Sequence, residues 1–167
     1  NGVKQVRKKL RINIPAGVDT GTKLRVSGEG NAGLKGGPSG DLYVFIKVKK
    51  DSKLTREGIN IYSEITVSYL QAILGDTVEI DTVDGKVNLD IPGGTQPNSV
   101  LTLDNKGVPR LGNPVARGNH DVSIKVKLPT RINDDEKKLL ENLASHYSSQ
   151  NKNTNSGLFS KFFGKDY

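Results

Sequence analysis

The sequence predicts an all-β protein built from two small units of one topology, followed by a C-terminal helix. Three observations predict this fold class: a segment that occurs twice, apolar residues that alternate along it, and one helical apolar pattern near the end of the chain. The two copies are IPAGVDTGTKLRVSGEG (residues 14–30) and IPGGTQPNSVLTLDNKG (residues 91–107). Self-similarity of this kind indicates a repeated structural unit.

The repeat extends beyond these two segments. Ile14 matches Ile91 at a distance of 77 residues, and after one inserted residue the distance becomes 78. At that distance the residues IKVK occur identically at 46–49 and at 124–127. The matching positions are mostly apolar residues, glycines and prolines, which set strands and turns. We therefore expect two β units of one topology rather than a chance likeness of two simple stretches.

Apolar and polar residues alternate in both arms of the first copy. A period of two is typical of half-buried strands. The motif IPAG (14–17) is expected to end a strand, because proline cannot donate to a ladder and glycine accepts a positive φ. The alternating residues are Leu10, Ile12 and Ile14 in the first arm and Leu42, Val44, Ile46 and Val48 in the second.

The second copy is preceded by elements that the first copy lacks. INIYSEITV (59–67) and DTVEIDTV (76–83) predict strands, and the DG pair that follows (84–85) predicts a hairpin turn to KVNLDI. SYLQAILG (68–75) predicts one or two helical turns that end at Gly75. A first-copy counterpart of Ile59 would precede residue 1, so we expect the chain to begin inside a domain of a longer protein.

The region after the second copy predicts one long helix. NDDEKKLLENLASHY (133–147) opens with Asn133 as a cap and Glu136 at the capping-box position, and acidic residues crowd its first turn. SSQNKNTNSG (148–157) then predicts a disordered linker, and LFSKFFGK (158–165) is an apolar cluster. One face of the helix is apolar and consists of Leu139, Leu140, Leu143, Ala144 and Tyr147.

Composition limits both the core and the partners. Of the 167 residues 34% are apolar and 5% aromatic, and Cys, Met and Trp are absent. Small cores of Ile, Leu and Val are therefore expected. The net charge of +7 favours acidic partners, or simply solubility. No apolar run approaches the ~20 residues that span a bilayer, and no signal peptide is visible, so we expect a soluble protein with no membrane partner.

No arrangement in the sequence predicts catalysis. Neither His120 nor His146 has a cysteine or a second histidine at ligand spacing, and we expect both on the surface. Nucleophile–base motifs are absent, and GEGNAG (28–33) is followed by a turn and a strand instead of the helix that binds phosphate. A chain without cysteine has no thiolate metal site. We therefore expect no catalytic residues and no metal ligands.

Seven motifs occur together in an order that resembles one protein family. They are IPAGVDTG (14–21), GEG (28–30), GDLYV (40–44), AILGD (72–76), VDGKV (83–87), GTQ (94–96) and KGVP (106–109). From about residue 3 to residue 145 the chain resembles the C-terminal substrate-binding region of the DnaJ family of J-domain co-chaperones. GVPRLGNPVARGNHD (107–121) and GLFSKFFGK (157–165) resemble its cyanobacterial and plastid branch.

The resemblance implies two tandem β-sandwich domains of the same fold, each with a short helix, plus a C-terminal dimerisation helix. It places a first domain without its N-terminal strands at 1–52, the second at 53–130, the helix at 131–147 and a flexible tail at 148–167. It also implies a cysteine-rich zinc module before Asn1. Zinc is thus expected in the full-length protein, and no cofactor in this chain.

The implied function is that of a co-chaperone, not an enzyme. Members of the family bind unfolded polypeptide clients and deliver them to a DnaK-type ATP-dependent chaperone. This chain has neither a J-domain nor its His-Pro-Asp motif, so we expect it to bind or hold clients and not to drive a chaperone cycle. The expected location is the plastid stroma or the prokaryotic cytoplasm.

The family's client groove implies candidate residues in the first copy. Leu10 and Val44 match part of its apolar lining, and Ile12, Leu42 and Ile46 are neighbouring candidates. An extended peptide can add a strand to a sheet edge and place alternate side chains in apolar pockets. The alternative is that these residues form an ordinary core.

We expect the C-terminal helix to form a homodimer and consider three roles for the tail. The candidate homodimer contacts are Leu139, Leu140, Leu143 and Tyr147, the alternative being packing of the helix on its own second β unit. For the tail at 158–163 we consider packing on the dimer, incidental order in a crystal, and an internal mimic of a client.

A basic β module that binds nucleic acid is the alternative function. The positive charge favours it, but the sequence lacks the stacking aromatic platform of single-strand binders, so nucleic acid is an unlikely partner. Salt separates the two functions, because nucleic-acid binding weakens steeply with salt and apolar client binding does not.

Overall fold

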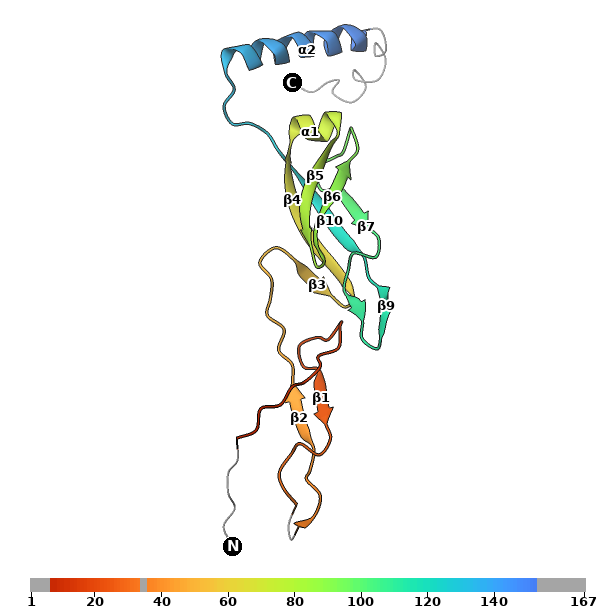
Figure 1. The fold of residues 1–167 in the computed structure, drawn as a ribbon. Coiled ribbons are helices and arrows are strands. Elements are labelled where there is room, and N and C mark those ends of the chain that lie inside the picture. Colours follow the sequence, from red (N-terminus) through yellow and green to blue (C-terminus); the bar gives the residue numbers. More distant parts are fainter. Residues whose placement is uncertain (1–6, 34–35, 153–167) are drawn as a thin grey trace, which may run out of the picture. The chain divides into compact units, whose positions relative to one another are not determined.

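The chain folds mostly into β-strands, with one short helix and one long C-terminal helix (Figure 1). The computed structural model describes residues 7–33 and 36–152. Contacts divide the chain into two compact parts, Asn1–Lys127 and Leu128–Tyr167. The strands and the short helix belong to the first part, and the long helix belongs to the second. The prediction of a β-rich chain with a C-terminal helix is confirmed.

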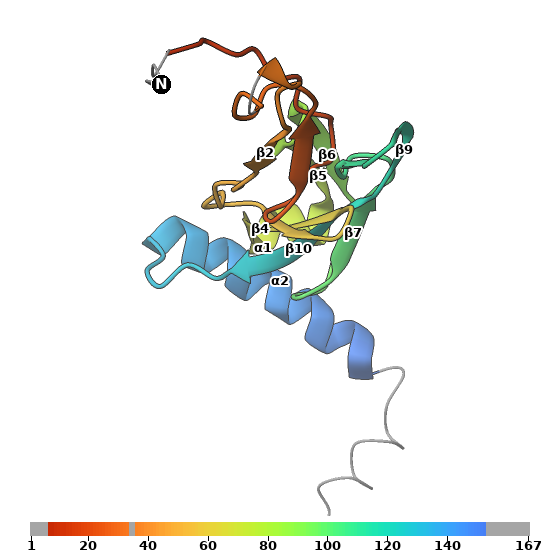
Figure 2. The same ribbon diagram turned by 90° about the horizontal axis from the view of Figure 1, so that it is seen from below.

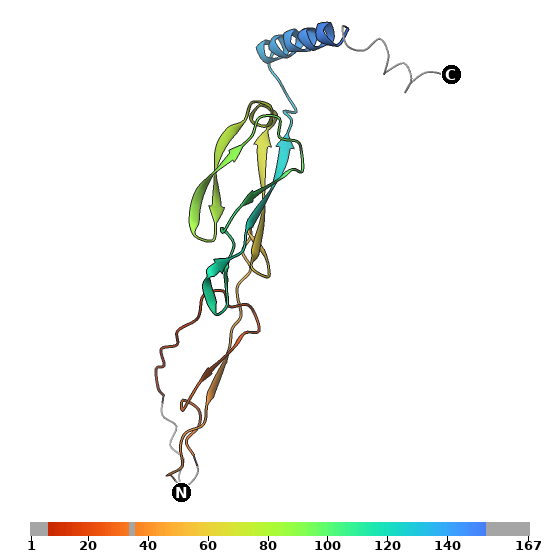
Figure 3. The ribbon, with the colours of Figure 1, turned by 90° about the vertical axis from the view of Figure 1, so that its right-hand side faces the viewer.

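The largest sheet has four strands in the order β3-β4-β10-β7 (Figure 1). β10 has neighbours on both edges, since it pairs with β4 in parallel and with β7 antiparallel. The hairpin of β5 and β6 packs against this sheet and forms a second layer in Figure 3. The strands are β3 (Thr55–Glu57), β4 (Asn60–Ser68), β5 (Asp76–Thr82), β6 (Gly85–Ile91), β7 (Val100–Leu103) and β10 (His120–Lys127).

The short helix α1 (Tyr69–Leu74) follows β4 and ends at Gly75, as predicted. Ser68 and Gln71 form a capping box, in which each side-chain oxygen accepts from the other residue's backbone N–H. Gly75 ends the helix with a φ of 84°, a conformation that glycine adopts without steric cost. The predicted short helix is thus confirmed.

Aliphatic side chains form the core of this region, as the composition predicts. Full burial of one such side chain contributes about 1.5–3 kcal/mol relative to exposure. Val122 and Ile124 of β10 are 0% exposed, so the inward face of this strand is fully buried in the core. The buried cluster consists of Val67, Ala72, Ile80, Leu89, Ile91, Val122 and Ile124.

A further hairpin, β8 (Pro109–Arg110) and β9 (Asn113–Arg117), was not predicted and stands apart from β4 and β10 in Figure 2. Arg117 fixes its base, because the guanidinium donates to Gly107 O and pairs with Asp84 at 2.8 Å. Its short strands are joined by an irregular register, which leaves no clear period of two for a sequence pattern to detect.

The region of the first copy forms a two-stranded antiparallel sheet of β1 (Lys23–Val26) and β2 (Leu42–Phe45). The strand expected at residues 10–14 is wrong. Among the described residues this segment has no strand ladder, and Ile14 is 60% exposed. Its counterparts in the second copy belong to β6, which pairs with β5. Residues 7–33 and 36–52 contain no counterpart of β5, so the alternating residues have no partner strand.

The repeat itself is confirmed by matching backbone hydrogen bonds. We call residues 10–49 the first repeat and residues 87–127 the second repeat. The bonds Gly21 N–Ile46 O (2.9 Å), Ile46 N–Thr22 O (2.9 Å) and Gly30 N–Gly40 O (2.8 Å) recur as Asn98 N–Ile124 O (2.8 Å), Ile124 N–Ser99 O (2.9 Å) and Gly107 N–Gly118 O (2.8 Å). The two repeats therefore share one backbone path around their paired strands.

The second compact part contains α2 (Asp134–Lys152). Its capping box is the predicted one, because Asn133 N donates to Glu136 Oε2 and Glu136 N donates to Asn133 Oδ1, both at 2.8 Å. Residues 148–152, expected as linker, are helical. They contain no glycine or proline that would end a helix. The tail at 158–163 lies outside the described residues.

The two histidines have different surroundings. His146 is exposed, as predicted, but the expectation that His120 lies on the surface is wrong, because it is 0% exposed. The period of two places His120 with Val122 on the inward face of β10. Its Nε2 lies 2.7 Å from Ser63 Oγ, and its Nδ1 has no hydrogen-bond partner within the described residues. Burial lowers the pKa of His120 below its ordinary value.

Candidate functional site

One face of the β1–β2 hairpin is an apolar strip. Leu42, Val44 and Ile46 lie two residues apart, so they point to the same side of β2 and of the segment that extends it. Leu24 of β1 stands opposite Val44, and Val26 stands opposite Leu42. Leu42 is 36% exposed, and Val44 and Ile46 are half-buried. Three of the predicted client-site residues are therefore brought together and remain partly accessible.

The other face of β2 carries two aromatic residues that the sequence analysis missed. Tyr43 is 47% exposed and Phe45 is 69% exposed. The ammonium of Lys23 lies 4.2 Å from the ring centre of Tyr43 and 5.6 Å from that of Phe45. A cation over an exposed ring contributes about 0.5–1 kcal/mol. The signal was the alternation in LYVF, whose aromatic positions form a second face of the same strand.

One edge of β2 has no partner among the described residues. In an antiparallel pair the backbone N–H groups point alternately toward the partner and away from it. Ile46 N donates to Thr22 O on the β1 side, so the N–H groups of Tyr43 and Phe45 point to the opposite edge. No described strand pairs with that edge. The corresponding edge of β10 is covered by β4.

The long helix α2 carries an apolar stripe. Leu139 is 70% exposed, Leu143 is 51% exposed and Tyr147 is 62% exposed, while Leu140 is half-buried. These residues recur every three or four positions, so they lie along one side of the helix. Exposed stripes of large apolar side chains are typical of interaction surfaces.

Ion pairs at the surface shift the pKa values of Lys53, Asp81 and Lys86. Lys53 donates to Asp81 at 2.7 Å, and this bond lowers the pKa of Asp81 and raises that of Lys53. The described residues contain no group of three or more His, Cys, Asp or Glu that could hold a metal ion. Within residues 7–33 and 36–152, no helix is long and apolar enough to cross a membrane.

Comparison with known proteins identifies the family. The DnaJ C terminal domain matches residues 2–129. The chain belongs to this DnaJ family. It is 82% identical over 166 residues to the chaperone protein DnaJ of Prochlorococcus marinus subsp. pastoris. The aligned region covers 99% of the chain and 44% of that relative. The chain is 59% identical over 165 residues to the chaperone protein DnaJ of a Cyanothece species, covering 98% of the chain and 44% of the relative.

A third relative, chaperone protein DnaJ 1 of a Synechocystis species, is 64% identical over 147 residues, or 87% of the chain and 39% of its own length. The chain thus spans less than half the length of these curated relatives. The resemblance stated from the motifs is confirmed. The DnaJ family binds zinc in a cysteine-rich region, and no residue of this chain fits such a site, because it contains no cysteine.

Two of the candidate DnaJ client-site residues, Leu10 and Ile12, belong to no strand that pairs with β2 among the described residues. Leu10 and Ile12 are half-buried on an irregular segment, and no ladder joins this segment to β2 among the described residues. Lys8 of this segment forms an ion pair with Glu29 at 2.7 Å. Strand β2 and the segment that extends it therefore bring Val44 together with Leu42 and Ile46, and Leu10 belongs to a segment outside the described ladders.

Proposed function

We propose that the first repeat binds extended apolar segments of unfolded proteins as an added strand on β2. One observation carries this proposal: β10 is paired on both edges, whereas its counterpart β2 is paired on one. Unpaired N–H and C=O groups at a sheet edge are a template for another strand. The apolar strip next to that edge supplies contacts for alternate side chains of the bound segment.

The remaining candidates extend this proposal. Leu10 and Ile12 serve as additional apolar contacts at the end of the strip, and Tyr43 and Phe45 contact the other side of the bound segment. Nothing catalytic is required, so the protein acts as a binding partner and not as an enzyme. In the longer protein the bound client passes to a DnaK-type chaperone.

The wider organisation is also proposed from the family. We infer two tandem β-sandwich domains, at 1–52 and 53–130, with the first completed by strands outside this chain and zinc bound outside it too. The cyanobacterial relatives favour a prokaryotic cytoplasm over a plastid stroma.

Fluorescence anisotropy with a labelled apolar peptide tests the proposal. Val44→Asp should weaken binding at least about tenfold, because a carboxylate in an apolar contact loses hydration without gaining a partner. Val115→Asp is the matched control, since Val115 lies on β9 and is 89% exposed. Equal affinities of the two folded variants contradict the proposal. A steep loss of affinity with salt, together with binding of single-stranded DNA, favours the nucleic-acid alternative.

We further propose that α2 mediates homodimerisation through its apolar stripe. Leu139→Glu combined with Leu143→Glu should convert the dimer to a monomer in sedimentation velocity. Asn142→Glu combined with Ser145→Glu adds the same charge to the same helix outside the stripe. A monomer for the unsubstituted chain at high micromolar concentration contradicts this proposal.

A further inference from the structure

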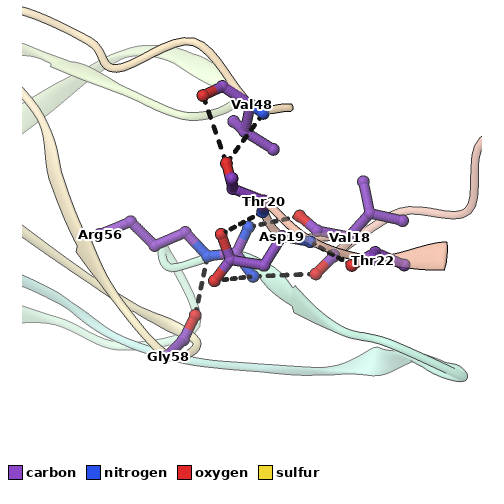
Figure 4. Close-up of polar contacts among 8 residues, drawn as sticks. Val18, Asp19, Thr20, Thr22, Val48, Arg56 and Gly58 are labelled. Atoms are coloured by element: carbon purple, nitrogen blue, oxygen red, sulfur yellow. Dashed lines mark hydrogen bonds and ion pairs between the residues drawn. The ribbon is translucent and has the colours of Figure 1, made fainter. Parts of the chain in front are cut away.

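Arg56 of β3 bonds to a loop of the first repeat (Figure 4). Its Nη1 donates to Val18 O at 2.7 Å, and its Nη2 donates to Gly17 O at 2.8 Å. Its Nε donates to Gly58 O at 2.8 Å, which fixes the guanidinium on its own side. The side chain is only 22% exposed, and Nη2 lies 4.0 Å from Asp19 Oδ2. One planar group thus hydrogen-bonds to the first repeat and to the turn between β3 and β4, whose sheet also contains β7 and β10 of the second repeat.

The same loop approaches β8 closely. A Cβ added to Gly17 would lie 2.1 Å from Pro109 O and 3.0 Å from Leu111 N. Gly94 is the counterpart of Gly17 in the second repeat and has nearly the same φ, 83° against 85°. A Cβ added to Gly94 would meet nothing within 4 Å. The close approach is therefore a property of the first-repeat loop and not of the repeated turn.

A third contact joins this loop to Val48, near the end of the first repeat. Thr20 Oγ1 accepts from Val48 N at 2.9 Å and donates to Val48 O at 3.4 Å (Figure 4). The position that matches Thr20 in the second repeat is Pro97, which has no hydroxyl. Three sets of contacts that the repeat does not explain therefore meet at residues 17–20.

We propose that Arg56 is a positioning residue, which clamps the loop at 17–20 onto β3 and β8 so that the two repeats turn as one body. Two β units joined by a short connection move relative to each other unless contacts between them prevent it. The clamp supplies such contacts through charge-assisted hydrogen bonds from Arg56 to two carbonyl groups. The close approach of Gly17 to Pro109 adds a backbone contact beside them. An apolar segment bound to the first repeat is then held at a set orientation to the second. The clamp does not depend on client binding.

Distance measurements between two spin labels test the clamp. The chain contains no cysteine, so Ser27→Cys in the first repeat and Asn88→Cys on β6 provide two unique sites, both exposed. The unsubstituted background should give one narrow distance distribution. Arg56→Ala should broaden it about twofold, because the units regain independent motion, and Arg56→Lys should broaden it less.

Arg117→Ala is the matched control. Arg117 also donates to a backbone carbonyl and pairs with an acidic residue, but its partners are Gly107 and Asp84, neither of which belongs to the first repeat. This variant should leave the width of the distribution unchanged. An unchanged width for Arg56→Ala, or equal broadening by both variants, overturns the proposal.

A second pair of variants tests the clamp even if Arg56→Ala unfolds. Gly17→Ala and Gly94→Ala introduce the same backbone strain, since both glycines have positive φ, but only the first adds a collision. Gly17→Ala should broaden the distribution and Gly94→Ala should not. Equal widths for the two variants overturn the proposal. The client proposal can fail separately. If the chain binds no apolar peptide while the label distances stay as the clamp predicts, the client proposal is overturned and the clamp stands.

Discussion

Strands β2 and β10 occupy matching positions in the two repeats and have different surroundings. Val122 and Ile124 of β10 are 0% exposed, whereas their counterparts Val44 and Ile46 are only half-buried. The hydrogen bonds to β1 and β7 are the same in the two repeats. The same local pattern therefore gives a sealed core where a second neighbour strand is present and an accessible strip where none is described.

The comparison also explains the lengths of the two strands. β10 continues to Lys127 because β4 pairs with it along its whole length, up to Ser68. β2 ends at Phe45, although the residues that follow, IKVK, are identical in the two repeats. Identical residues are thus strand in one repeat and irregular in the other. Pairing, and not intrinsic preference, decides the outcome.

The largest expected effect is on the core side of the comparison. Ile124→Ala removes a fully buried side chain and should lower the stability of the second repeat by about 2–5 kcal/mol. Ile46→Ala is the matched variant and should cost less than half as much, because Ile46 is only half-buried. Urea unfolding followed by the amide NMR signals of each repeat measures both. Equal losses would remove the distinction between a sealed and an accessible strand.

The second largest effect concerns Gly40 and Gly118, which match across the repeats and should differ in how much stability an alanine costs. A Cβ at Gly118 would lie 2.1 Å from Ile59 O, whereas a Cβ at Gly40 would meet only Asn31 O, at 3.9 Å. Gly118→Ala should therefore destabilise the second repeat by about 1–3 kcal/mol or more, as overpacking does, and Gly40→Ala should change stability little. A calorimetric scan of both variants checks this. A large loss for Gly40→Ala would contradict this difference between the two glycines.

The smallest expected effect concerns His120. Burial lowers its pKa in the folded state, so the unfolded chain binds the proton more readily. Stability of the second repeat is therefore full above the ordinary pKa of 6.5 and falls as the pH drops below it. One proton limits the slope to about 1.4 kcal/mol per pH unit.

His120→Leu tests that assignment and installs the residue found at the matching position, Leu42. This variant should lose the pH dependence between pH 7 and pH 5, measured by urea midpoints at each pH. A slope that persists in the variant would show that a group other than His120 causes it.

The elements that the sequence predicted correctly are those with local signals. α1 and α2 have capping boxes at Ser68 and Asn133, and β10 follows a period of two. Residues 10–14 have the same period without a described partner strand, so their predicted strand does not form. The burial of His120 follows from its position in the alternation of β10, which places it with Val122, and not from the polarity of its side chain. The clamp at Arg56 depends on contacts 38 and 39 residues apart, which no local pattern reveals.

Hydrogen exchange at four backbone amides tests the central claim most directly. The N–H groups of Tyr43 and Phe45 point to the open edge of β2, and those of their counterparts Asp121 and Ser123 point to β4. Asp121 and Ser123 should exchange slowly with or without an apolar peptide. Tyr43 and Phe45 should exchange quickly alone and slow markedly when the peptide is bound. If Tyr43 and Phe45 still exchange quickly with saturating peptide bound, β2 is not the edge to which clients add.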